Sequence, residues 1–282
     1  MNKYLSLIKF SHTIFAMPFA FIGFFLATKM NEFEWATLIY VILCMVFARS
    51  AAMAFNRYID RDIDTKNERT AKVREIPNGT ITPKNALFFV ILNSFLFVTT
   101  TYFINTLCFA LSPIALLVIL GYSYTKRFTA LCHLVLGLGL ALAPIGAYLA
   151  VSGEFAIVPL LFSAAVLFWV SGFDIMYALQ DEEFDKEHKL HSIPVLLGKK
   201  NALNLSNLLH FLTFSALSIA GSLGGFSLYY WIGFWSFSGL LIYQHTLVKH
   251  NDLSKVNLAF FTTNGIASLI FGAFVIADLL LK

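Results

Sequence analysis

The sequence predicts an all-α protein of the integral membrane class, a bundle of about nine transmembrane helices. Its composition is 58% hydrophobic and only 13% charged, whereas soluble domains are about 25% charged. Apolar stretches of about 17–25 residues, the length that crosses a bilayer, recur along the whole chain. Lysine and arginine gather in alternate loops, as the positive-inside rule requires. Together these observations exclude a soluble domain.

Nine apolar stretches define the expected helices in chain order. They lie at roughly 12–28, 35–56, 86–104, 107–124, 132–151, 156–178, 204–222, 226–246 and 257–281. The third and fourth are separated by little more than Asn105 and Thr106, so this boundary is the least marked. Short loops without a long soluble insert predict a single domain, residues 1–282. No signal peptide is expected, because the first apolar run has no small-residue cleavage site. His12, in that first run, is expected to be a hydrogen-bonded interior residue.

The distribution of basic residues predicts the orientation. With the N-terminus in the cytoplasm, seventeen basic residues fall in inside loops, and the outside receives Lys29 and Lys282. This asymmetry places the N-terminus and the long loops 57–85 and 180–203 on the cytoplasmic side of an inner membrane. It also accounts for the net charge of +4, so no nucleic-acid partner is expected.

Two acidic motifs, 121 residues apart, end the second and sixth apolar stretches. Each reads polar-x-x-x-Asp-x-x-x-Asp, with the residues Asn56, Asp60 and Asp64, then Tyr177, Asp181 and Asp185. Residues spaced i, i+4 and i+8 line one face of a helix. Similar sequence follows both motifs: Ile-Pro, a glycine, and then Lys-Asn-Ala-Leu at 84–87 and 200–203. We therefore expect two parallel four-helix repeats plus one helix around a central cavity.

The four aspartates of these motifs predict a metal site. Carboxylates on facing helices repel one another unless a positive charge lies between them, and Mg²⁺ commonly bridges one or two carboxylates to a substrate phosphate. The motifs thus indicate a membrane enzyme that holds a phosphorylated substrate through Mg²⁺. Acidic helix ends solvated near the headgroups are the alternative, which the matched spacing of the two motifs disfavours.

Two charged residues lie within apolar stretches, where charge is costly and usually functional. Arg49 precedes Asn56 by seven residues, and Asp174 precedes Asp181 by seven. Arg49 is expected either to bind a carboxylate or phosphate through its planar fork or to form an ion pair with Asp174. Asp174 is expected to have a basic partner or to accept a proton.

The loop after the fourth apolar stretch carries Lys126 and Arg127. These two basic groups can grip a diphosphate or an acidic acceptor, or they can be further positive-inside signals.

These residues resemble the UbiA family of intramembrane aromatic prenyltransferases. The resemblance covers most of the chain and rests on R-x6-N-x3-D-x3-D, from Arg49 to Asp64, and on D-x2-Y-x3-D-x3-D, from Asp174 to Asp185. It continues through Arg69-Thr70 and a Pro-x-Gly, through Lys126-Arg127, and through Ser192, seven residues after Asp185.

The resemblance implies a polyprenyl diphosphate donor and an aromatic acid acceptor, with the prenyl tail in membrane lipid. Mg²⁺ would be bound by Asp60, Asp64, Asp181 and Asp185. The substrate-binding residues that it implies are Arg49, Asn56, Lys126, Arg127, Asp174, Tyr177 and Ser192.

The chain departs from the 4-hydroxybenzoate members of the family at several positions. Those members carry Lys and Gly where this chain has Glu187 and Lys189, and Arg-Pro-Leu where it has Arg-Glu-Ile at 74–76. The stretch 190–194, Leu-His-Ser-Ile-Pro, is similar to members associated with menaquinone made by the futalosine route. We expect prenyl transfer to 4-hydroxybenzoate in ubiquinone-type biosynthesis, with a dihydroxynaphthoate-type acceptor in menaquinone biosynthesis as the alternative.

Other classes of membrane protein fit the sequence less well. A transporter could also contain charged residues within its spans beside a parallel repeat, but it would not need two matched Asp motifs of the kind that bind a metal. A CDP-alcohol phosphotransferase has a denser D-G-x2-A-R signature, which this sequence lacks.

Overall fold

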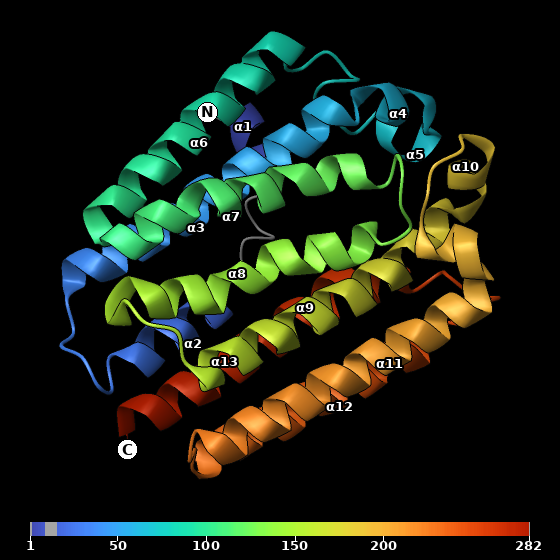
Figure 1. Cartoon of the computed structure of the whole chain (residues 1–282). Helices are drawn as coiled ribbons and strands as arrows, with labels where there is room; N and C mark the ends of the chain where they lie inside the picture. The colour runs from blue at the N-terminus through green and yellow to red at the C-terminus, as the bar shows by residue number, and fades with distance from the viewer. Residues whose placement is uncertain (1, 9–15, 282) are drawn as a thin grey trace. The chain divides into compact units, whose positions relative to one another are not determined.

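The computed structural model describes residues 2–8 and 16–281, so His12 and the start of the first predicted span lie outside the described residues. The regular secondary structure of these residues consists of helices, apart from one isolated β-bridge between Lys249 and Asp252, which confirms the all-α prediction (Figure 1). The helices form two compact units. Each unit is described by itself, and the single-domain organisation stays a prediction.

The first unit contains the described residues up to Ile8 together with residues 35–124. Its helices are α1 (Asn2–Leu7), α3 (Trp35–Ile59), α4 (Arg61–Lys66), α5 (Glu68–Ala71), α6 (Pro83–Ile104) and α7 (Thr106–Thr125). The long helices α3 and α6 pack against each other. A small core near the start of α6 joins Leu7 to Ala54, Ile76 and Val90.

The second unit contains residues 16–34 and 125–281. Its helices are α2 (Met17–Ala27), α8 (Cys132–Ser152), α9 (Ile157–Ala178), α10 (Glu182–Glu187), α11 (Ile193–Leu223), α12 (Leu228–Leu247) and α13 (Asn264–Leu281). A 3₁₀ turn, Leu179–Asp181, precedes α10, and a π-helical turn, Leu258–Thr263, precedes α13. Helix α9 packs against both α8 and α11, while α2 packs against α8 and α13.

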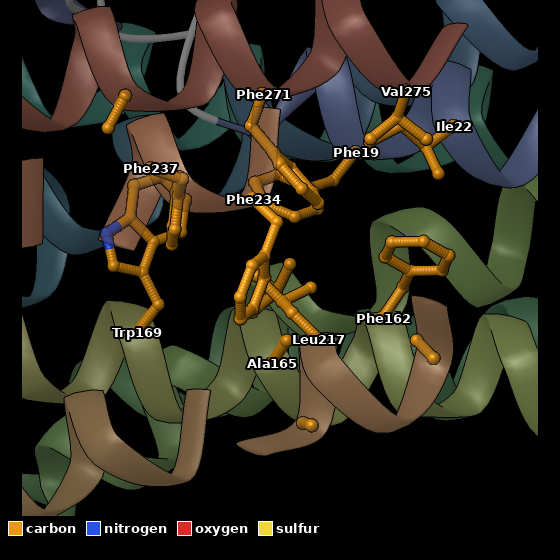
Figure 2. Close-up of a cluster of buried hydrophobic side chains, with 14 of the residues drawn as sticks. Phe19, Ile22, Phe162, Ala165, Trp169, Leu217, Phe234, Phe237, Phe271 and Val275 are labelled. Atoms are coloured by element: carbon orange, nitrogen blue, oxygen red, sulfur yellow. The ribbon is translucent and has the colours of Figure 1, made fainter. Parts of the chain in front are cut away.

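An aromatic core holds the second unit together (Figure 2). Trp169 of α9 packs with Phe19 of α2 and with Phe237 of α12, at ring-centroid distances of 5.5 and 5.4 Å. The indole N–H of Trp169 donates to the side-chain oxygen of Asn264 at 3.0 Å, so its buried polar atom is satisfied. Such a core fixes α9, the helix that leads into the second acidic motif.

Within residues 2–8 and 16–281, each of the nine predicted apolar stretches corresponds to a helix. Seven helical segments in the described part of the chain are long and apolar enough to cross a membrane, so the protein is an integral membrane protein. The other two are α2, which has 11 residues, and α12, which is rich in Tyr and Trp. The boundary between the third and fourth stretches is confirmed, since α6 ends at Ile104 and α7 begins at Thr106 around an extended Asn105.

The compact units do not follow the boundary between the two sequence repeats. The repeats assign the first apolar stretch to the first four-helix copy, yet α2 packs within the second unit, against α8 and α13. Gly23 of α2 lies so close to the backbone of Pro144 in α8 that a side chain there would clash. Glycine at position 23 therefore permits the close backbone approach between α2 and α8.

Candidate active site

The first acidic motif lies where α3 ends and α4 begins, in the first unit. Asp60 separates the two helices and has φ −86° and ψ 4°, a sparsely populated backbone region in which active-site residues often lie. Its N–H still donates to the carbonyl of Asn56 at 2.9 Å, and its carbonyl accepts from the N–H of Asp64 at 2.7 Å. The expected i, i+4, i+8 spacing is thus kept, although the motif spans a helix end and not the body of one helix.

Both carboxylates of the first motif are buried, Asp60 with 2% and Asp64 with 3% exposed surface. The Asn56 amide donates to Asp60 Oδ2 at 2.9 Å. The Arg74 guanidinium pairs with Asp64 Oδ2, and the Thr70 hydroxyl donates to the Asp64 carbonyl at 3.0 Å. The loop after α4 therefore folds back over the motif and brings a cation to it.

Further charged and polar groups surround this motif. Arg49 and Arg57 both lie on α3, and the Nε atom of each is buried without a hydrogen-bond partner. Tyr122, near the end of α7, lies within electrostatic reach of Arg49, Arg57 and Asp60. The sequence prediction named Arg49 but not Arg57, Arg74 or Tyr122. It counted Arg57 only as a positive-inside signal, although Arg57 directly follows Asn56, and it left the segment 69–74 open between diphosphate binding and a positive-inside signal.

The second acidic motif lies where α9 ends, in the second unit. A 3₁₀ turn follows Ala178, and Asp181 separates it from α10 with φ −102° and ψ 3°. Asp181 and Asp185 are half-buried. Electrostatic contacts link the Asp185 carboxylate to Asp181 and Lys126, and Ser192 also lies beside it.

The segment after α10 is tied to the loop after α7. The chain reverses at Lys189, which has a φ of 56°. The N–H of Leu190 then donates to the Asp185 carbonyl at 2.8 Å, and the N–H of His191 donates to the Lys126 carbonyl at 2.7 Å. The second unit thereby brings Lys126, Asp181, Asp185 and Ser192 together, as a common substrate site requires. Arg127, the next residue of the loop, is half-buried.

Asp174 precedes the motif, and Tyr177 is its first residue; the two lie three residues apart on the same face of α9. Asp174 Oδ2 lies 2.7 Å from Nδ1 of His133 on α8, so its described partner is a residue that the sequence prediction did not name. A single His in an apolar stretch gave no pattern that could have revealed this contact. Arg49 belongs to the other unit, so its pairing with Asp174 stays a prediction. Tyr177 packs on Phe260 of the π-helical turn at a centroid distance of 4.1 Å.

The donor set of these motifs suits a hard divalent cation. Within the described residues, no group of three or more His, Cys, Asp or Glu side chains gathers around a single point. Each motif instead offers two carboxylates, and Mg²⁺ usually completes its coordination with water and substrate phosphate oxygens. The oxygen-only ligands fit Mg²⁺ better than a softer metal that prefers sulfur or imidazole.

Sequence comparison places the chain among known proteins. Residues 16–266 match the model of the UbiA prenyltransferase family. A 4-hydroxybenzoate octaprenyltransferase of Aliivibrio fischeri (strain MJ11) is 33% identical over 242 residues, which are 84% of this chain and 82% of that protein. The enzyme of the same name from Aliivibrio salmonicida is 34% identical over 245 residues, or 85% and 84% of the two chains.

Solved structures with the same fold include two archaeal homologues. The apo structure of a UbiA homologue from Aeropyrum pernix K1 has a TM-score of 0.86 and 32% identity, and the match covers 95% of this chain and 98% of that one. A UbiA homologue from Archaeoglobus fulgidus, bound to DMAPP and Mg²⁺, has a TM-score of 0.73 at 23% identity and covers 99% and 100%.

Proposed function

Since this chain belongs to the UbiA prenyltransferase family, we propose that it transfers a polyprenyl chain from polyprenyl diphosphate to an aromatic acid. The acceptor proposed first is 4-hydroxybenzoate, in ubiquinone-type quinone biosynthesis, because the curated relatives carry that activity in their names. The observation that carries the proposal is the pair of Asp motifs with matched spacing and matched backbone, each at the end of a long apolar helix.

A dihydroxynaphthoate-type acceptor in menaquinone biosynthesis is the second candidate. It is favoured by the residues that follow the second motif, where Glu187 and Lys189 depart from the 4-hydroxybenzoate pattern. The stretch Leu190–Pro194 also resembles the menaquinone-associated members. This stretch carries Ser192 and is hydrogen-bonded to the Lys126 carbonyl. Its residues are therefore proposed to influence which acceptor binds.

The donor diphosphate is proposed to lie among the four motif aspartates and nearby basic groups. Asp60, Asp64, Asp181 and Asp185 would hold Mg²⁺, which lowers the charge of the leaving diphosphate and acts as a Lewis acid. Arg74 contacts Asp64, and Lys126 acts on Asp185, so each motif also has a cation of its own. These cations and Arg127 would stabilise the negative charge that develops as the C–O bond breaks.

The acceptor is proposed to bind deeper in the membrane than the diphosphate. Arg49 precedes Asp60 by eleven residues, or about 16 Å of helix rise, and its guanidinium would bind the acceptor carboxylate. Asn56 holds Asp60, and Tyr177 would contribute an aromatic wall against water and toward an allylic cation. The acceptor ring carbon would then attack, while the prenyl tail stays in lipid.

We also propose that both motifs face the cytoplasm, with the N-terminus inside and the protein in the inner membrane. The support is the uneven distribution of basic residues. Single cysteines in the loops 57–85 and 180–203, in a background without Cys44, Cys108 and Cys132, should resist an impermeant thiol reagent applied to intact cells. Labelling of both loops from outside would contradict this orientation.

Product analysis tests the proposed function. Purified protein in lipid nanodiscs would receive Mg²⁺, a polyprenyl diphosphate, and either 4-hydroxybenzoate or 1,4-dihydroxy-6-naphthoate. Mass spectrometry should detect a prenylated aromatic acid with one of these acceptors, and the favoured acceptor assigns the pathway. No product with any aromatic acid would contradict the proposal, as would substrate transport by proteoliposomes without any chemistry.

A further inference from the structure

His133 joins three helices next to the second acidic motif. It lies on α8, its Nδ1 is 2.7 Å from Asp174 Oδ2 on α9, and its Nε2 accepts from the N–H of Ile193, the first residue of α11, at 3.3 Å. The His133 side chain has 5% exposed surface, whereas Asp174 keeps 22%. The His133 imidazole is thus buried, whereas the Asp174 carboxylate stays partly accessible.

The backbone N–H of Ile193 determines which tautomer of His133 fits. In a neutral imidazole one ring nitrogen donates and the other accepts, while both donate in the charged form. Because Ile193 presents a donor, Nε2 must accept, and the proton then resides on Nδ1 and is donated to Asp174. This arrangement orients the Asp174 carboxyl group as a hydrogen-bond acceptor for His133.

The acceptor is proposed to lie deeper in the membrane than the motif aspartates, and Asp174 likewise lies deeper than Asp181 of its own helix end. It precedes Asp181 by seven residues, which is about 10 Å deeper along the helix, and it shares a face of α9 with Tyr177. We propose that Asp174 accepts the ring proton and that His133 is the positioning residue that orients it; this rests on the proposed function. The aryl carbon forms a bond to prenyl C1, and the C1–O electron pair leaves with the diphosphate. The proton lost from that ring carbon passes to Asp174 and then to water.

A purely structural role for His133 is the competing explanation. The Nε2 bond caps an N–H at the start of α11, where the helix itself provides no acceptor, and Ser192 offers no side-chain cap there. His133 would then matter only because it anchors α11. The two bonds leave from different ring nitrogens, so substitutions can separate them.

Two amide variants retain one bond each. The amide nitrogen of Asn reaches the position of Nδ1, so His133→Asn keeps a donor for Asp174 and loses the bond to Ile193. The amide of Gln reaches the position of Nε2, so His133→Gln keeps an acceptor for Ile193 and loses the bond to Asp174. We expect His133→Asn to retain kcat within a few-fold and His133→Gln to lose roughly 10- to 100-fold, with the KM for the prenyl donor unchanged in both.

A double-mutant cycle with Asp174→Asn completes the kinetic test. Asp174→Asn should lower kcat by about 100-fold or more, and adding His133→Gln should have no further effect, because the two residues act as one unit. The reverse order of the amide variants, or equal activity of both, would overturn the inference. So would a loss in His133→Gln that persists at full size beside Asp174→Asn.

A spectroscopic test is independent of turnover. The chain contains 7 histidines, and ¹⁵N-histidine spectra of wild type and His133→Asn identify the signals of His133 by difference. We expect a neutral Nδ1–H ring at neutral pH; an Nε2–H tautomer or a charged ring would overturn the inference. A wild type inactive on every acceptor contradicts the proposed function instead, whereas an active wild type with an unimpaired His133→Gln contradicts only this inference.

Discussion

The two acidic motifs share a backbone but differ in the side chains around them. In the first motif the long helix α3 ends at Ile59, directly before Asp60, and in the second α9 ends at Ala178 and a 3₁₀ turn leads to Asp181. The middle aspartate has nearly the same φ and ψ in both. In the first motif the carboxylates are buried and Arg74 reaches Asp64. In the second they are half-buried, and the nearby cation is Lys126 from another loop. The repeat thus preserves the backbone conformation of the middle aspartate, while the burial and the charged neighbours of the carboxylates differ.

The same comparison extends to the loops that follow the motifs. Gly79 has a φ of 79° and Gly198 a φ of 73°. Each precedes a long apolar helix, from Pro83 in one case and continuing from Lys199 in the other. Left-handed backbone at both positions explains why both repeats carry glycine there.

Loss of a motif carboxylate should have the largest effect. We expect Asp60→Ala, Asp64→Ala, Asp181→Ala and Asp185→Ala each to lower kcat by about 10³-fold, and EDTA to abolish wild-type turnover, since the diphosphate charge is then uncompensated. Asp62→Ala and Glu187→Ala, which remove exposed carboxylates of the same two segments, are the matched controls. The rate of prenyl transfer is measured for each variant and for the wild type after metal removal. Unequal losses at the two motifs would contradict their equivalence, and full activity in EDTA would contradict the role of Mg²⁺.

Substitution of the cation beside each motif, Arg74 or Lys126, should have the next largest effect and should differ between the motifs. Arg74→Ala should raise the KM for the prenyl diphosphate by about 10- to 100-fold, and Arg74→Lys should recover only part of this, because the planar fork is lost. Lys126→Arg should be mild, since Lys126 acts through its charge. Steady-state kinetics with the donor varied measures both. Equal tolerance of Lys and Arg at both positions would remove the proposed difference.

Arg49 tests whether the first motif also serves the acceptor. If it binds the acceptor carboxylate, Arg49→Lys should raise the acceptor KM by about 10-fold and leave the donor KM nearly unchanged. If it pairs with Asp174 instead, Arg49→Lys should be mild and should leave the KM of both substrates nearly unchanged, because the charge is kept. Kinetics with each substrate varied in turn distinguishes the two roles.

The two left-handed glycines should give the smallest effect. Gly79→Ala and Gly198→Ala should each destabilise the protein by about 1 kcal/mol, because alanine disfavours a positive φ. Gly146→Ala, in α8 with open space around it, should be neutral by comparison. Thermal unfolding in detergent measures the order. A neutral result at one glycine alone would mean that only the other loop depends on its left-handed turn.

Hydropathy alone predicted the helices, because length and apolar content suffice to recognise a membrane span. The same signal could not predict that α2 packs within the second unit, since that depends on the close approach of Gly23 and Pro144. The i, i+4, i+8 spacing of each motif predicted one helix face, but such spacing is equally compatible with the change of helix that the structure contains at Asp60 and Asp181.

The candidate site was predictable where residues form a pattern and not where they meet across helices. The motif aspartates repeat along the chain, so their spacing revealed them. His133 and Asp174 are 41 residues apart, and nothing in the sequence around His133 indicates a partner. The positive-inside rule already explained Arg57, and for Arg74 the sequence could not decide between that rule and diphosphate binding.

The π-helical turn Leu258–Thr263 also sets the rotation of everything that follows it. A π turn holds one more residue than an α turn, and here Gln244 donates to the Ala259 carbonyl within it at 3.0 Å. Removing one residue from this turn would restore α-helical spacing and rotate α13 by about 100° about its axis. Phe271 and Val275, both fully buried in the aromatic core (Figure 2), would then leave it. The extra residue therefore sets the rotation of α13 so that Phe260 contacts Tyr177 while Phe271 and Val275 stay in the aromatic core.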